Sequence, residues 1–148
     1  MSRDACSRRY VSAPAFEAVA YAADLACRYG ASLYIVYVYE PLSYALPDGI
    51  AMPTPQQHAE IEALFLRHVA NARSAALAAG APHVETLLLR GDAIREIVSL
   101  AKDQAFDLIV MGTHGRRGLN HAFLGSVAEH VLRTAPCPVM TVRIPEAS

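Results

Sequence analysis

The chain has 148 residues, of which 53% are apolar and 18% are charged, and its 13 basic and 14 acidic residues give a net charge of −1. This composition predicts one domain spanning 1–148 with a buried core, and it excludes a disordered chain. A chain so close to neutrality has no basic excess, and we expect no nucleic-acid partner.

Apolar runs and cysteines exclude further classes. No apolar run approaches the roughly 18 residues that a membrane helix requires, and no apolar stretch follows the start MSRDACSRRY. We therefore expect neither a membrane segment nor a secretory signal. Cys6, Cys27 and Cys137 form no CxxC and no metal-ligand spacing. Scattered cysteines in odd number favour reduced thiols, a cytoplasmic location and no metal site.

Helical and strand-like segments alternate along the first half. Apolar residues recur at helical spacing in 15–29 and in 57–79, and each segment is followed by a glycine. Between them, the β-branched and aromatic run 32–39 predicts a buried strand. The interval 41–55 contains four prolines and predicts a long loop.

The second half repeats this alternation. Segments 83–89 and 106–111 are apolar and predict strands, and Asp92 is placed to cap a helix between them. The last predicted segments are a Gly-rich loop, a helix and a strand: 112–124, 126–133 and 138–143. Strands joined through helices imply right-handed crossovers, a parallel sheet and helices on both of its faces.

The Gly-rich loop after Met111 is the strongest candidate site, because ligands of such sheets bind at the C-terminal ends of the strands. Gly112 and Gly115 let the chain turn off the strand and allow a ligand to approach backbone amides. Gly125 and Ser126 open a helix whose first amides have no internal partners. The two ends of the loop therefore predict a phosphate site that needs no lysine.

Several residues of this loop allow two interpretations. Ser126 with Glu129 matches the S-x-x-E capping box, so it either caps the helix or shares these amides with a phosphate. His114 is either a general base or phosphate contact, or a residue that orients the loop. Arg116 and Arg117 either contact phosphate or form a solvated loop tip. The loop matches neither the Walker A nor the GxGxxG pattern. Because the sequence also contains neither a Ser/His/Asp order nor an HExxH motif, we assign no catalytic residue.

The spacing G-x2-G-x9-G-S, directly after an apolar strand that ends in Met, resembles the nucleotide-binding loop of the universal stress protein family. The segments RGDAIREIVSLAKDQAFDLIVMG and AVAYAADLACRYGASLYIVYVYE are also similar to that family, so the resemblance covers about 13–143. It implies one universal stress protein domain over 1–148, with 41–55 as a loop insertion. The implied fold is a flavodoxin- or Rossmann-like three-layer sandwich with five parallel strands in the order 3-2-1-4-5.

The same resemblance implies a regulatory protein of the stress response that binds ATP, with or without Mg²⁺, and that at most hydrolyses ATP slowly. The implied nucleotide contacts are Val38, Met111, Gly112, Thr113, His114, Gly115, Arg116, Gly125, Ser126 and Val127. Among them, Met111 and Val38 would wall the adenine and ribose. The implied partners are a second copy, paired through the last strand at about 138–143, and an unidentified regulatory protein.

The predicted first strand, 5–11, departs from the family pattern, in which an apolar strand ends in an Asp. Here no acid lies between Asp4 and Glu17, and Arg8 and Arg9 stand where buried apolar residues are expected. Since residues 5–10 can be encoded so that a one-base shift reads His-Val-Leu-Val-Ala, we hypothesise a reading-frame change in this stretch. The missing acid favours one alternative to ATP-dependent regulation, a nucleotide-free dimeric interaction module. The other alternative is a slow ATPase that uses His114 or a water held by the loop, and it would need a metal-positioning acid that is absent here.

Overall fold

The computed structural model describes residues 9–12, 16–40, 44–113 and 124–143. Five of its strands form one parallel sheet in the order β5-β2-β1-β6-β7. These strands are β1 (Arg9–Ser12), β2 (Ser32–Tyr39), β5 (His83–Arg90), β6 (Leu108–Gly112) and β7 (Val139–Val142). The predicted α/β class is confirmed.

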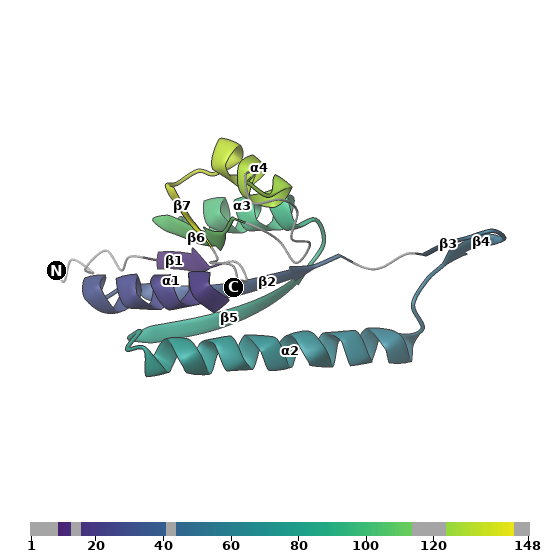
Figure 1. Cartoon of the computed structure of the whole chain (residues 1–148), viewed down its shortest axis with the longest axis horizontal. Helices are drawn as coiled ribbons and strands as arrows, with labels where there is room; N and C mark the ends of the chain where they lie inside the picture. The colour runs from purple at the N-terminus through teal and green to yellow at the C-terminus, as the bar shows by residue number, and fades with distance from the viewer. Residues whose placement is uncertain (1–8, 13–15, 41–43, 114–123, 144–148) are drawn as a thin grey trace, which may run out of the picture.

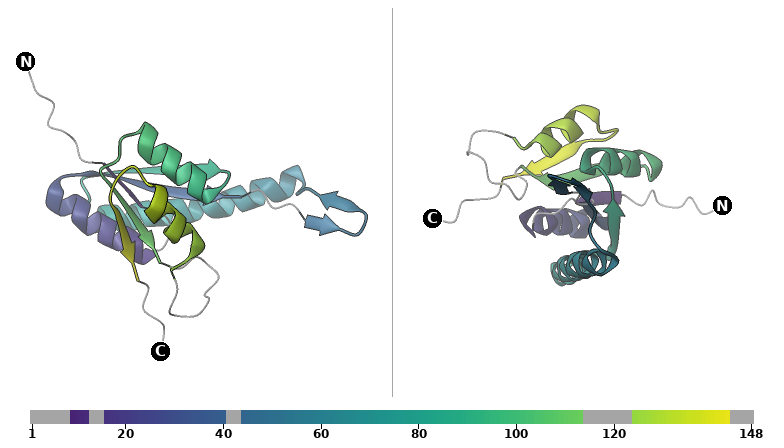
Figure 2. Two further views of the ribbon diagram at one scale, coloured as in Figure 1. Left: turned by 90° about the horizontal axis from the view of Figure 1, so that it is seen from above. Right: turned by 90° about the vertical axis from the view of Figure 1, so that its right-hand side faces the viewer.

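Helices cover both faces of this sheet (Figures 1 and 2). The helices are α1 (Phe16–Tyr29), α2 (Pro55–Ala78), α3 (Ala93–Asp103) and α4 (Ser126–Thr134). Residues of β2 alternate between two apolar clusters, because successive side chains of a strand point to opposite faces. Leu33 and Ile35 join the cluster beneath α1 and α2, whereas Val36 joins the cluster beneath α3 and α4.

Local hydrogen bonds define the starts of two helices. α2 begins with a reciprocal capping box, in which the Thr54 hydroxyl accepts a hydrogen bond from the Gln57 N–H and the Gln57 side chain accepts one from the Thr54 N–H. α3 begins after Asp92, whose carboxylate accepts a hydrogen bond from the Arg95 N–H at 2.8 Å. The prediction that Asp92 caps this helix is therefore confirmed.

The interval 41–55 differs from its prediction as a loop, because it contains an antiparallel hairpin. The hairpin consists of β3 (Tyr44–Leu46) and β4 (Gly49–Ala51), which form a two-stranded sheet of their own. Its prolines do not prevent pairing, since they fall in the turn and outside the strands, where no ladder N–H is required. Figure 1 shows the hairpin projecting beyond the main sheet, at the N-terminal end of α2.

The predicted first strand, whose sequence departs from the family pattern, lies at the centre of the sheet. β1 begins at Arg9, later than the predicted 5–11, and Tyr10 pairs with Leu33 on one side and with Leu108 on the other. Residues 5–8 lie outside the described residues. The arginine at position 9 therefore does not prevent β1 from pairing with both β2 and β6.

Candidate functional site

The C-terminal ends of two strands extend past β1 and frame the candidate site. Ser12, the last residue of β1, pairs with Ile35 of β2 and Val110 of β6, and both strands continue further, to Tyr39 and Gly112. The chain winds outward from β1 in both directions, so this is the point at which the winding of the sheet reverses. Doubly wound sheets bind ligands at this position.

Three predicted site residues belong to the apolar cluster beneath α3 and α4. Met111 is buried in the cluster beneath α3 and α4, and Val38 and Val127 are partly buried against the same cluster. The three residues come from β2, β6 and α4, far apart in the sequence. All three therefore pack into the core on the same side of the sheet.

Thr113 joins the two ends of that loop. Its N–H donates to the Val142 carbonyl at 3.0 Å, which ties the end of β6 to β7. Its own carbonyl accepts a hydrogen bond from the Gly125 N–H at 2.6 Å. Gly112 and Thr113 therefore lie next to the start of α4. Sequence reasoning missed the role of Val142, because a backbone carbonyl partner leaves no signal in the residue type.

The capping box predicted for Ser126 and Glu129 at the start of α4 is wrong. Gly125 is the N-cap and Ser126 is already the first helical residue, and the described residues give this helix no side-chain cap. Glu129 does not reach back to the cap; its carboxylate pairs with Arg133 at 2.8 Å. The helix begins one residue too early for Ser126 to cap it, so the first amides of α4 lack the side-chain acceptor that the sequence suggested.

The remaining predicted contacts of the loop lie outside the described residues. They are His114, Gly115 and Arg116, together with the neighbouring Arg117. Their roles stay predictions from the sequence.

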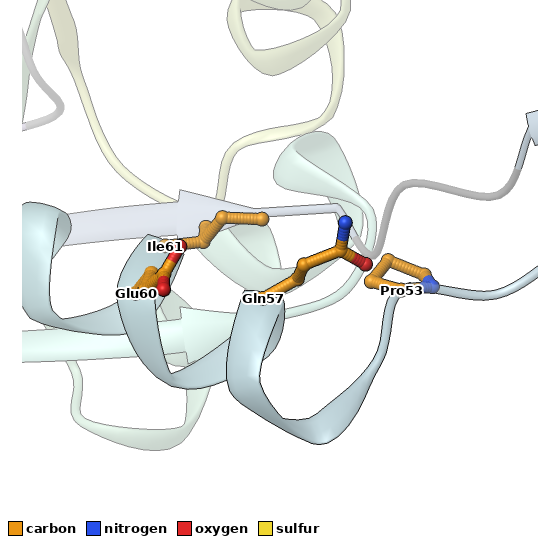
Figure 3. A pocket seen from close by; sticks show the side chains of 4 residues that line it. All are labelled: Pro53, Gln57, Glu60 and Ile61. Carbon is orange, nitrogen blue, oxygen red and sulfur yellow. The ribbon is translucent and has the colours of Figure 1, made fainter.

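A pocket elsewhere on the molecule does not coincide with this site. It has a volume of about 160 Å³ and is lined by Pro53, Gln57, Glu60 and Ile61, at the N-terminal end of α2 (Figure 3). Pockets for small-molecule ligands usually measure roughly 300–1,000 Å³. This pocket is therefore too small for a nucleotide, and it shares no residue with the predicted site.

The described residues contain neither a cluster of metal ligands nor a membrane-spanning helix. No group of three or more His, Cys, Asp or Glu side chains in this part of the chain is arranged to hold a metal ion. No helix among the same residues combines the length and apolar character needed to cross a bilayer.

Comparison with known proteins extends over nearly the whole chain. Residues 11–143 match the Universal stress protein family. The chain is 36% identical over 116 residues to a universal stress protein of Thermus aquaticus. These residues make up 78% of this chain and 80% of that relative.

Solved structures agree in fold. A universal stress protein in complex with cAMP has a TM-score of 0.70 and 26% identity, covering 94% of this chain and 98% of its own. A universal stress protein from Archaeoglobus fulgidus in complex with dAMP has a TM-score of 0.63 and 25% identity. The match covers 90% of this chain and 96% of the other chain. Because the family match takes in the sheet, the helices and the candidate loop together, the chain belongs to the universal stress protein family.

Proposed function

We propose that this chain binds an adenine nucleotide, ATP, at the C-terminal edge of its sheet and acts as a regulatory protein of the stress response. The observation that carries the proposal is the junction between Thr113 and Gly125, which sets the end of β6 beside the first amides of α4, to which the described residues give no side-chain cap. Exposed amides at a helix N-terminus favour a phosphate. The two solved relatives named above are complexes with cAMP and dAMP, which share an adenine and a phosphate.

The roles in this proposal divide between the loop and the apolar lining. The phosphates would contact backbone amides at five positions: Gly112, Gly115, Gly125, Ser126 and Val127. The adenine and ribose would lie against Val38 and Met111, which belong to the same apolar cluster. The nucleotide would act as a ligand that shifts the population of a binding-competent surface, so no catalytic base is required.

The proposal includes a homodimer and a cytoplasmic location. β7 lies at one edge of the sheet and pairs with β6 on one side, so its other side offers backbone groups to a second copy. The described thiols, Cys27 and Cys137, are free, which suits a reducing compartment.

The test compares wild-type protein with Ser126→Asp and Ser126→Asn. Ser126 is an exposed residue in the first turn of α4. A carboxylate there suits the helix dipole and preserves the fold, but it repels a phosphate. We expect ATP to co-purify with the wild type and to raise its melting temperature, and we expect Ser126→Asp alone to lose both effects. Repeating the melts in EDTA shows whether Mg²⁺ contributes.

Two outcomes would contradict the proposal. If Ser126→Asp and Ser126→Asn retain the same ATP-dependent stabilisation, the phosphates do not bind at α4. If millimolar ATP fails to raise the melting temperature of the wild type, the chain is better described as a nucleotide-free interaction module. The absence of an acid between Asp4 and Glu17 is the feature that favours this second function.

A further inference from the structure

Thr113 connects the strand at one edge of the sheet to the helix that adjoins the candidate site. Its N–H donates at 3.0 Å to the carbonyl of Val142, the last residue of β7, and its own carbonyl accepts from the Gly125 N–H at 2.6 Å. The Gly125 carbonyl in turn accepts from the Glu129 N–H at 2.9 Å, which closes the first turn of α4. A continuous series of backbone hydrogen bonds therefore runs from β7 to the N-terminus of α4.

The hydrogen bonds of β7 also show which of its backbone groups face outward. Just before this strand, the Pro138 carbonyl accepts from the Ile109 N–H of β6 at 3.0 Å, and at its end the Val142 carbonyl accepts from Thr113. Even-numbered positions therefore face β6. Because backbone groups of a strand alternate between its two sides, the N–H and carbonyl of Thr141 point away from β6. They lie along the edge of the sheet opposite to β5 (Figure 1).

We infer that nucleotide binding at α4 and pairing of β7 with a second copy strengthen each other through Thr113. This inference rests on the nucleotide site and the β7 dimer of the proposed function. A strand from a second copy would hold β7 in place as far as Val142, whose carbonyl accepts from the Thr113 N–H. A phosphate on the first amides of α4 would hold Gly125 against the Thr113 carbonyl from the other end.

The sign of this coupling follows from the cost of ordering the junction. β7 is four residues long and pairs, among the described strands, with β6 alone, so its end is held from one side. Whichever partner binds first orders the junction between β7 and α4, and the other then binds without that loss of conformational entropy. Linkage requires both effects to have the same size, and we expect a factor of at least about five.

Sedimentation velocity of the full chain measures the first half of this linkage. The dissociation constant of the dimer is determined without ligand, with ATP and with adenosine, which has no phosphate to contact α4. We expect ATP to lower this constant at least about fivefold and adenosine to leave it unchanged. If ATP raises the melting temperature of the wild type but leaves the dimer constant unchanged, the coupling is wrong and the nucleotide site stands. A wild type that stays monomeric at the highest concentration would also overturn the coupling.

Thr141→Pro measures the second half. Proline removes the outward N–H through which a second copy would pair, and an edge strand tolerates proline where that N–H faces solvent. Thr141→Val keeps the N–H and should stay dimeric, so it is the matched control. The proline variant should be monomeric and should bind ATP more weakly than the valine variant, by the factor through which ATP tightens the dimer. Equal ATP affinities in the monomeric and dimeric variants would contradict the coupling.

Amide hydrogen exchange tests the route without any nucleotide. The Thr113 and Gly125 amides should exchange at least about fivefold faster in monomeric Thr141→Pro than in the dimeric wild type. The Glu96 amide, which donates to the Asp92 carbonyl at 2.9 Å at the start of α3, is the internal reference and should not change. Wild type diluted below its dimer constant should show the same two changes without a substitution. If both amides exchange equally in monomer and dimer, Thr113 transmits nothing, and the inference fails whether or not ATP binds.

Discussion

Gly91 determines how the end of β2 meets the start of α3. Its N–H donates to the Tyr39 carbonyl at 3.0 Å, one residue beyond the predicted site residue Val38. Its φ of +147° is accessible to glycine and rarely to other residues, and an added Cβ would lie 2.9 Å from the Glu96 carboxylate. The conformation therefore favours glycine here, whereas the flexible Glu96 side chain can move away from an added Cβ.

Gly91→Ala should destabilise the chain more than Gly30→Ala. Gly30 also has a positive φ, +63°, but an added Cβ there meets no atom within 4 Å. We expect a loss of about 1 kcal/mol for Gly30→Ala and about 2–3 kcal/mol for Gly91→Ala. Urea unfolding of both variants measures the difference, and equal losses would show that alanine adopts the φ of Gly91 as readily as that of Gly30.

Cys137 should react slowly with alkylating reagents. Burial, with a smaller contribution from the charge of Asp107, raises the pKa of the Cys137 thiol. At a given pH its thiolate fraction is therefore below that of an ordinary cysteine, and the fraction increases as the pH rises toward the raised pKa. We expect iodoacetamide to modify exposed Cys27 before Cys137 at pH 8, as followed by peptide mass spectrometry. Denaturant should remove the difference; a native Cys137 as reactive as Cys27 would contradict it.

Among the helices, α3 and α4 cover the same apolar cluster but begin in different ways. α3 has a side-chain cap in Asp92, whereas α4 begins at Gly125 and receives no such cap from the described residues. The uncapped helix is the one that adjoins the candidate site. A ligand phosphate would supply the acceptor that the described side chains do not provide there.

The two N-termini should respond differently to alanine. Asp92→Ala removes a hydrogen bond to the Arg95 N–H and should cost about 1 kcal/mol. Ser126→Ala removes no cap and should change stability by less than about 0.5 kcal/mol without nucleotide. Chemical denaturation in nucleotide-free buffer makes the comparison. A loss at Ser126 as large as that at Asp92 would restore the capping-box interpretation.

In the molecule as a whole, one sheet contributes side chains to both apolar clusters. Leu33 is fully buried in the cluster beneath α1 and α2, and Ile109 is fully buried in the cluster beneath α3 and α4. The strands that carry them are both paired with β1. Neither cluster can therefore lose its packing without loosening the sheet that supports the other.

Leu33→Ala and Ile109→Ala should each lower stability by roughly 2–5 kcal/mol, the usual cost of deleting a buried aliphatic side chain. Each variant should still unfold in a single transition, with coincident changes in circular dichroism and tyrosine fluorescence. Two separated transitions in either variant would show that the clusters unfold independently.

Much of the element order follows from local sequence alone. Helical and alternating periodicities predicted the segments that become α1, β2, α2 and β5, because those patterns repeat within a few residues. The hairpin in 41–55 escaped prediction, because its strands are only three residues long and four prolines lie around them. The N-cap of α4 escaped it as well, since a shift of one residue changes which side chain caps the helix.

By itself, the sequence determined the order of the elements and marked the loop after Met111 as the candidate site, through the glycines that free backbone amides. Only the tertiary structure placed Val38 in the same apolar cluster as Met111 and joined Thr113 to Gly125. The reason is that periodicity and capping act over one or two turns of chain. Contacts between distant strands, and the faces that they leave uncovered, depend on how all the elements pack together.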